Sequence, residues 1–169
     1  ILGRPPRLVS EIIAGKRADG LWHWELVRTD AGTAWVVPYL ELLRKKRPNA
    51  FVADARCPLV EEIRNCVGER RLLVPKPAEW AQWCAKTLQI LTETHDVRHR
   101  GQEPLTNAVK YVERKDYPGG VFVWKREEPQ GDVTPWLALT LAVGGVVVKG
   151  AKKRSIPLVG VGAQVGSDG

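Results

Sequence analysis

Residues 119–148, GGVFVWKREEPQGDVTPWLALTLAVGGVVV, combine a short strand pattern with a long apolar segment, and this combination decides the fold class. The side chains from Val121 to Arg126 alternate between two faces, which predicts a strand. Thr134 followed by Pro135 is typical of a helix start, because proline is favoured at the first helical position. No charged residue then follows until Lys149. The stretch therefore predicts a strand that leads into a buried helix.

Asp132 stands directly before this apolar segment and has two interpretations. It stabilises the helix start through capping and the helix dipole, which is the commoner role for a lone Asp. Alternatively, it is a metal ligand at the exposed mouth of a rigid element, which requires a second carboxylate nearby. The apolar run is shorter than the roughly 20 residues of a membrane span. Gly144 and Gly145 also interrupt it, so we expect a core helix.

Outward from this stretch, the chain predicts alternating strands and helices. Two strands, 8–15 and 21–29, flank the hairpin signal Asp19-Gly20. Helices are expected at 38–46, 58–67, 77–92 and 104–114, and short strands at 50–55 and 71–74. Trp80 and Trp83 share the apolar face of the longest amphipathic helix. This order predicts an α/β domain with a mixed sheet and helices packed against it.

Composition indicates a globular domain with a polyanionic partner. The chain has 169 residues, 44% of them hydrophobic and 27% charged, which suits one domain with a substantial core. Its net charge is 26 − 19 = +7, which favours nucleic acid as a partner over a membrane, because no basic amphipathic helix or lipidation motif is present. The three cysteines lack metal-binding spacing and suggest reduced thiols. A P-loop and the serine-hydrolase motifs are absent.

The two ends of the chain predict a fragment with a loose tail. The sequence contains no methionine and begins at Ile1, so we expect a domain taken from a longer polypeptide. Residues 1–149 are expected to form that domain. Residues 150–169 are rich in glycine and start with a basic cluster, so we expect them to form a loosely ordered tail.

Asp54 is a second carboxylate that could bind a metal together with Asp132. It follows the apolar residues 50–53, which suit a central strand, and precedes Arg56-Cys57-Pro58. Taken alone, Asp54 is more simply a turn-capping residue. In open α/β sheets, however, sites gather at the carboxyl ends of strands. Together the two carboxylates could share a divalent metal site, as in phosphodiester cleavage by two metal ions about 3.5–4 Å apart.

The order and separation of several segments resemble the nuclease domain of the large terminase subunit of tailed bacteriophages. The segments are ADGLWHWELV (18–27), GTAWVVPYL (32–40), FVADARCP (51–58), RHRGQEPLTNAV (98–109) and WKREEPQGDVTPWLALTLA (124–142). The resemblance implies an RNase H-like fold, with a mixed β-sheet and helices packed on both faces. In that family one metal-binding carboxylate follows the strand matched by Val52–Asp54, and another precedes the final helix. The resemblance therefore implies catalytic, metal-binding roles for Asp54 and Asp132.

The same resemblance implies a function in viral DNA packaging. The expected activity is a metal-dependent DNA endonuclease that hydrolyses phosphodiester bonds with little sequence preference, using Mg²⁺ or Mn²⁺ in a two-metal site. The expected partners are double-stranded DNA, an N-terminal ATPase domain of the same polypeptide, the portal and the small terminase subunit, with no membrane. The expected location is the host bacterial cytoplasm.

The chain departs from this family at its first metal-binding Asp. In the family that residue lies on a strand before the one matched by residues 8–15, and residues 1–4 contain no acid. Either the acid precedes Ile1 or this chain has lost it, and Glu11, the nearest acid, falls on a different strand. The alternative function is thus a catalytically incomplete DNA-binding or docking module of the same fold. A doubly wound nucleotide-binding domain ranks last, because no glycine-rich strand-to-helix turn is present.

Several further residues are candidates for supporting roles. Glu128 is a candidate auxiliary metal ligand, although a solvated pair with Glu127 is the more common arrangement. The DNA-binding candidates are the basic residues that would form a phosphate-facing rim: Arg98, His99, Arg100, Lys125 and Arg126. The seven tryptophans could stack on bases, but most are expected to pack in the core.

Overall fold

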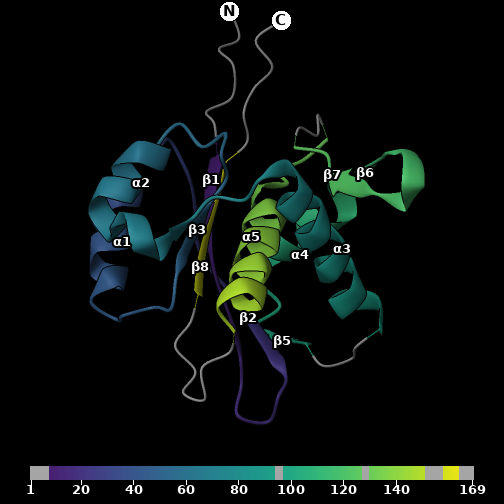
Figure 1. The fold of residues 1–169 in the computed structure, drawn as a ribbon, viewed down its shortest axis with the longest axis horizontal. Helices are drawn as coiled ribbons and strands as arrows, with labels where there is room; N and C mark the ends of the chain where they lie inside the picture. Colours follow the sequence, from purple (N-terminus) through teal and green to yellow (C-terminus); the bar gives the residue numbers. More distant parts are fainter. Residues whose placement is uncertain (1–7, 94–96, 127–129, 151–157, 164–169) are drawn as a thin grey trace, which may run out of the picture.

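The computed structural model of the chain describes residues 8–93, 97–126, 130–150 and 158–163 (Figure 1). A mixed six-stranded sheet in the order β4-β3-β8-β1-β2-β5 forms its centre. The strands are β1 (Leu8–Lys16), β2 (Trp22–Ala31), β3 (Phe51–Ala53), β4 (Leu72–Leu73), β5 (Val97–His99) and β8 (Leu158–Ala163). β1 is antiparallel to both β2 and β8, whereas β8, β3 and β4 are parallel. The predicted α/β class with a mixed sheet is confirmed.

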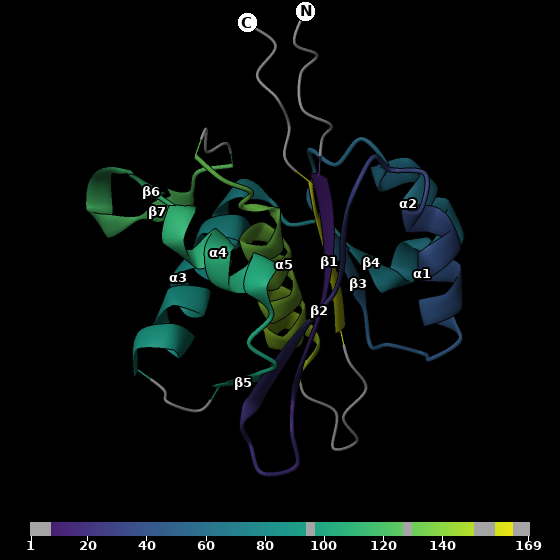
Figure 2. The same ribbon diagram turned by 180° about the vertical axis from the view of Figure 1, so that it is seen from behind.

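Helices cover both faces of this sheet (Figures 1 and 2). The helices are α1 (Val36–Arg44), α2 (Val60–Val67), α3 (Pro77–Glu93), α4 (Glu103–Tyr111) and α5 (Thr134–Lys149). Helices α1 and α2 pack on one face, and α3, α4 and α5 lie on the other. A separate two-stranded sheet, β6 (Arg114–Asp116) and β7 (Phe122–Trp124), extends beside α3.

The helix α5 is the centre of the larger core, as its apolar sequence predicts. Its residues from Thr134 to Val146 are buried, and it packs along β1, β8 and β3. Gly144 lies inside the helix rather than ending it. The Trp83 ring of α3 occupies the space that a Cβ would fill there, so glycine allows the two helices to pack closely. Trp80 and Trp83 are both buried, as their spacing predicts. None of the helices in the described part of the chain has the length and apolarity that crossing a bilayer requires.

The prediction of a loosely ordered tail was wrong for residues 158–163. These residues form β8, which lies between β1 and β3 in the centre of the sheet and pairs with both. Gly160 and Gly162 resemble linker residues in the sequence, but they are needed for packing. A Cβ at Gly162 would lie 2.7 Å from the Ala138 nitrogen and 2.8 Å from the Thr134 carbonyl oxygen of α5. Glycine allows the buried helix to approach the strand at this distance.

The predicted strand hairpin is confirmed, and most predicted elements lie within a few residues of their observed bounds. The short strands β5 and β6 were not predicted. Each has only three residues and lacks apolar alternation, so the sequence pattern gives little signal for them.

Candidate metal-binding site

Asp54 and Asp132 lie at the same edge of the main sheet, the one formed by the carboxyl ends of β3 and β8. Ala53, the last residue of β3, pairs with Val161 of the parallel strand β8, so Asp54 lies beside Gly162. The start of α5 covers the same end of β8, because the Thr134 carbonyl oxygen lies over Gly162. Asp132 stands two residues before Thr134. The carboxyl ends of β3 and β8 and the start of α5 therefore converge at this edge.

β8 separates the two positions across the sheet. Asp54 follows β3, whereas Asp132 is connected through Thr134 to Ser10 of β1, on the other side of β8. Two strand spacings amount to about 10 Å between the backbones of β3 and β1. Between them, the backbone of α5 at Thr134 and Ala138 lies directly over Gly162.

Asp132 is held at the start of α5 through one of its two carboxylate oxygens. Its Oδ1 accepts a hydrogen bond from the Thr134 backbone N–H at 2.9 Å and another from the Thr134 hydroxyl at 2.7 Å. No described residue bonds its Oδ2, and the side chain is only partly buried. Asp132 thus supports the helix start through Oδ1, in agreement with the capping interpretation.

A chain of hydroxyl groups, with Ser10 and Thr134 buried and Thr29 partly buried, fixes the orientation of this contact. The Thr134 hydroxyl lies 2.7 Å from the Ser10 hydroxyl, which lies 2.8 Å from the Thr29 hydroxyl on β2. An ionised carboxylate only accepts hydrogen bonds, so Thr134 must donate to Asp132 and accept from Ser10. Ser10 in turn accepts from Thr29. The direction of every hydroxyl in the chain follows from the charge on Asp132.

Asp54 is buried and already paired with a cation from the protein. Its Oδ1 accepts a hydrogen bond from the Arg56 backbone N–H at 2.9 Å. Its Oδ2 forms an ion pair with Arg126, and the two side chains are 4% and 17% exposed. The Arg126 guanidinium carbon also lies 4.7 Å from the ring centroid of Trp80. Burial lowers the pKa of Arg126 to about 10, so the guanidinium keeps its charge at neutral pH.

The other predicted DNA-binding residues do not join Arg126 in one rim. Lys125 is near it in sequence and pairs with Glu113. Arg98 and His99 lie on β5, where His99 pairs with Trp24, and Trp24 pairs with Ala14 near the end of β1. Ala14 pairs with the first residue of β8, at the opposite end of the sheet from Asp54. The structure therefore separates the basic residues into two groups.

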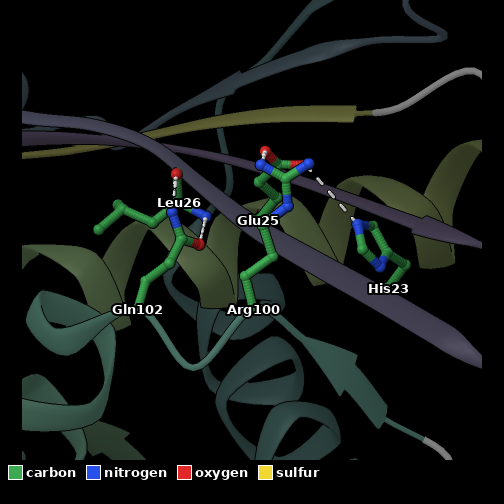
Figure 3. A network of polar contacts seen from close by, with 5 residues as sticks. All are labelled: His23, Glu25, Leu26, Arg100 and Gln102. Atoms are coloured by element: carbon green, nitrogen blue, oxygen red, sulfur yellow. Dashed lines mark hydrogen bonds and ion pairs between the residues drawn. The ribbon is translucent and has the colours of Figure 1, made fainter.

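Contacts with β2 hold Arg100 and Gln102, which follow β5, in place (Figure 3). Arg100 Nη1 pairs with Glu25 Oε1 at 2.9 Å, and the other oxygen of Glu25 lies 3.7 Å from His23 Nε2. The side-chain amide of Gln102 bonds both backbone groups of Leu26, accepting from its N–H at 2.8 Å. Gln102 thus continues the pairing along β2 beyond the end of β5, directly before α4.

Glu11 does not contribute to the edge that Asp54 and Asp132 share. It pairs with Val161, whose side chain packs on the face covered by α1 and α2, whereas Ser10 faces α5. Glu11 is fully buried, and neither of its carboxylate oxygens has a hydrogen-bond partner among the described residues. Burial raises its pKa to about 8, although nearby Arg28 partly opposes this effect.

The carboxylates at this edge suit a divalent cation in their chemistry. Oxygen ligands from Asp are those that Mg²⁺ and Mn²⁺ prefer. Oδ2 of Asp132 has no hydrogen-bond partner among the described residues, and Asp54 would offer its own Oδ2 if Arg126 moved. Over the described part of the chain, no cluster of three or more His, Cys, Asp or Glu residues has a metal-binding arrangement. Glu128, the predicted auxiliary ligand, lies outside the described residues.

No protein-family model, curated protein or solved structure matches this chain. The assignment of a function therefore rests on the fold and on the arrangement of these side chains.

Sequence reasoning did not find the partners that surround the two carboxylates. Arg126 was predicted to contact DNA phosphate rather than Asp54. Ser10 and Thr134 are 124 residues apart, and no local pattern connects two such hydroxyl groups. Gly162 lies in the segment that was predicted to be a tail.

Proposed function

We propose that the chain is a metal-dependent DNA endonuclease domain with an RNase H-like arrangement, similar to the nuclease of large terminase subunits. The observation that carries the proposal is the position of Asp54 and Asp132 on either side of the carboxyl end of β8. Two further features support it. The sheet combines the antiparallel strands β8, β1 and β2 with the parallel strands β3 and β4, and helices pack on both faces.

In this proposal Asp54 and Asp132 would be the residues that hold a divalent cation. Such an ion, Mg²⁺ or Mn²⁺, lowers the pKa of a bound water and neutralises charge that develops on the scissile phosphate. The protein's own part is positioning. Thr134 holds Oδ1 of Asp132 through its backbone N–H and its hydroxyl, which leaves Oδ2 for the cation. A second ion would need a further carboxylate beyond those that the described residues bring to this edge.

Basic residues near the two carboxylates suit contact with a DNA backbone. Arg126 lies at Asp54, Lys125 precedes it, and Arg56 follows Asp54 with its side chain exposed. The net charge of +7 favours binding of this kind, which weakens as salt concentration rises. In the packaging context that the sequence suggests, the substrate is double-stranded DNA, and an ATPase domain of the same polypeptide acts beside the nuclease.

Cleavage of supercoiled plasmid in millimolar Mn²⁺ tests the proposal. The wild-type chain should nick the plasmid, EDTA should stop the reaction, and Asp132→Asn should lower the rate on the order of 100-fold or more, since it removes a metal ligand. Asp116→Asn is the matched control, because Asp116 is an exposed carboxylate on β6. Equal loss of nicking in both variants, or nicking that persists in EDTA, would refute a metal role for Asp132.

A second candidate is a catalytically incomplete DNA-binding or docking module of the same fold. The ion pair between Asp54 and Arg126 favours it, because a guanidinium already neutralises the buried carboxylate. Gly162 also favours it. The close packing of α5 excludes a side chain at this position between the two acids, so the position cannot supply a further metal ligand. This candidate predicts salt-sensitive DNA binding that is independent of metal, with no cleavage in Mn²⁺.

A further inference from the structure

Arg126 and Asp54 come from separate parts of the fold. Asp54 follows β3 in the main sheet, whereas Arg126 follows β7 in the two-stranded sheet beside α3. The guanidinium lies over the Trp80 ring of α3 and pairs with Oδ2 of Asp54. The two residues follow strands of different sheets, so the strand pairing of β3 does not fix the position of Arg126.

The guanidinium and a divalent cation would need the same atom. Oδ1 of Asp54 already accepts the Arg56 backbone N–H, so Oδ2 is the oxygen that an additional cation would contact. Arg126 pairs with that oxygen. Two cations at one carboxylate oxygen repel each other, and in a buried site this repulsion is poorly screened.

We propose that Arg126 is an internal counter-ion of Asp54 that competes with the divalent cation and must leave Oδ2 before the cation binds. This inference rests on the metal role proposed above. Without a cation, the pair compensates a buried carboxylate that would otherwise be costly to keep ionised. With a cation bound, Arg126 is released from Asp54 beside the site, where its charge becomes available to a DNA phosphate.

The ion pair therefore has opposite effects on stability and on metal affinity. Removing Arg126 leaves Asp54 buried without a counter-ion, which destabilises the metal-free protein. The same change removes the competitor and strengthens metal binding. A cation that binds only the folded protein then restores stability, and this recovery should be larger in the variant than in the wild type.

Mn²⁺ titration by isothermal calorimetry, together with thermal unfolding, tests the inference without any measure of nuclease activity. Arg126→Gln should bind Mn²⁺ at least tenfold more tightly than the wild type. Its Tm should be lower without metal and should rise more on adding Mn²⁺. Lys110→Gln is the control, because it removes the same charge from an exposed lysine of α4, and its affinity should stay within about twofold of wild type.

Two further variants separate this inference from the proposed metal site. Asp54→Asn and Asp132→Asn should each abolish the Mn²⁺ binding. If they do so while Arg126→Gln binds Mn²⁺ no more tightly than wild type, the competition is refuted and the metal site stands. If Mn²⁺ binding persists in both Asn variants, or if no form binds Mn²⁺, the inference and the metal role both fail.

Arg126→Lys provides the same test if the glutamine variant does not fold. Lysine keeps the charge but lacks the planar guanidinium that stacks on Trp80 and pairs with the carboxylate. It should therefore compete less well, and we expect Mn²⁺ affinity between those of the wild type and Arg126→Gln. An affinity equal to or weaker than wild type would overturn the inference.

Discussion

Replacing Glu11 with glutamine should remove a pH-dependent loss of stability that the buried carboxyl group imposes. Glu11 lies in β1 with no exposed surface, and both of its oxygens lack partners within the described residues. Burial raises its pKa from 4.5 to about 8, with Arg28 acting in the opposite direction. The folded protein therefore holds a proton that the unfolded chain releases above pH 4.5. The contribution of Glu11 to the free energy of unfolding is greatest below that pH and falls as the pH rises towards 8.

The size of the effect follows from the linkage between proton binding and folding. One proton bound by the folded state alone changes the free energy of unfolding by about 1.4 kcal/mol per pH unit. The folded-state group begins to ionise as the pH nears 8, so between pH 5.5 and 7.5 the wild type should lose about 2.5 kcal/mol from this group. Glutamine has nearly the same shape and does not ionise, so Glu11→Gln should lack this contribution. The free energy of unfolding of the variant should therefore fall by that much less than that of the wild type between pH 5.5 and 7.5.

Urea denaturation at pH 5.5, 6.5 and 7.5, followed by tryptophan fluorescence, measures this difference. Other titrating groups are common to the wild type and the variant, so subtracting their stabilities isolates Glu11. Glu41→Gln on α1 is the matched control, because it makes the same substitution at an exposed side chain. The reasoning is refuted if Glu11→Gln and the wild type show parallel pH curves.

Three further substitutions test the packing and the hydrogen bonds that position the site. Thr134→Val removes the hydroxyl between Ser10 and Asp132 and should cost about 1–3 kcal/mol in urea denaturation. Thr140→Val, which removes a hydroxyl that bonds only within α5, should cost less, and equal losses would contradict the role of the hydroxyl chain. Gly160→Ala should destabilise by about 1–3 kcal/mol or more, because its Cβ would overlap the backbone of α5. Gly15→Ala has open space, so a similar loss there would count against the packing argument. Gln102→Ala should cost about 1 kcal/mol and speed hydrogen exchange of the β2 amide that it binds, whereas unchanged exchange would show that the contact is dispensable.

The sequence predicted the elements of the fold more completely than their arrangement. Alternation and helical periodicity are local properties, so they located the hairpin, the five helices and the strand of Asp54. They did not locate β8, because Gly160 and Gly162 have the composition of a linker. The need for glycine there comes from α5, whose backbone lies where a Cβ would be.

The candidate site was predicted in part for the same reason. Asp54 and Asp132 each follow a local rule, the first at a strand end and the second before a helix, so their position at one edge could be expected from the sequence. Arg126 was identified as basic, but its partner could not be, because the ion pair with Asp54 joins segments from two sheets. Similarly, Arg98 and Lys125 suggested one basic rim, and the strand order places them apart.

The amino-acid sequence by itself thus determined the α/β class, the buried final helix and the two carboxylates, because propensity, capping and hydrophobic period act over a few residues. Only the tertiary structure decided that a late segment becomes a central strand between β1 and β3. It alone decided that Glu11 faces away from the site while Ser10 faces it, since that depends on which side of the sheet each helix covers. It also decided that Asp54 has an arginine as its counter-ion. These outcomes depend on contacts between distant residues, which a local sequence pattern does not encode.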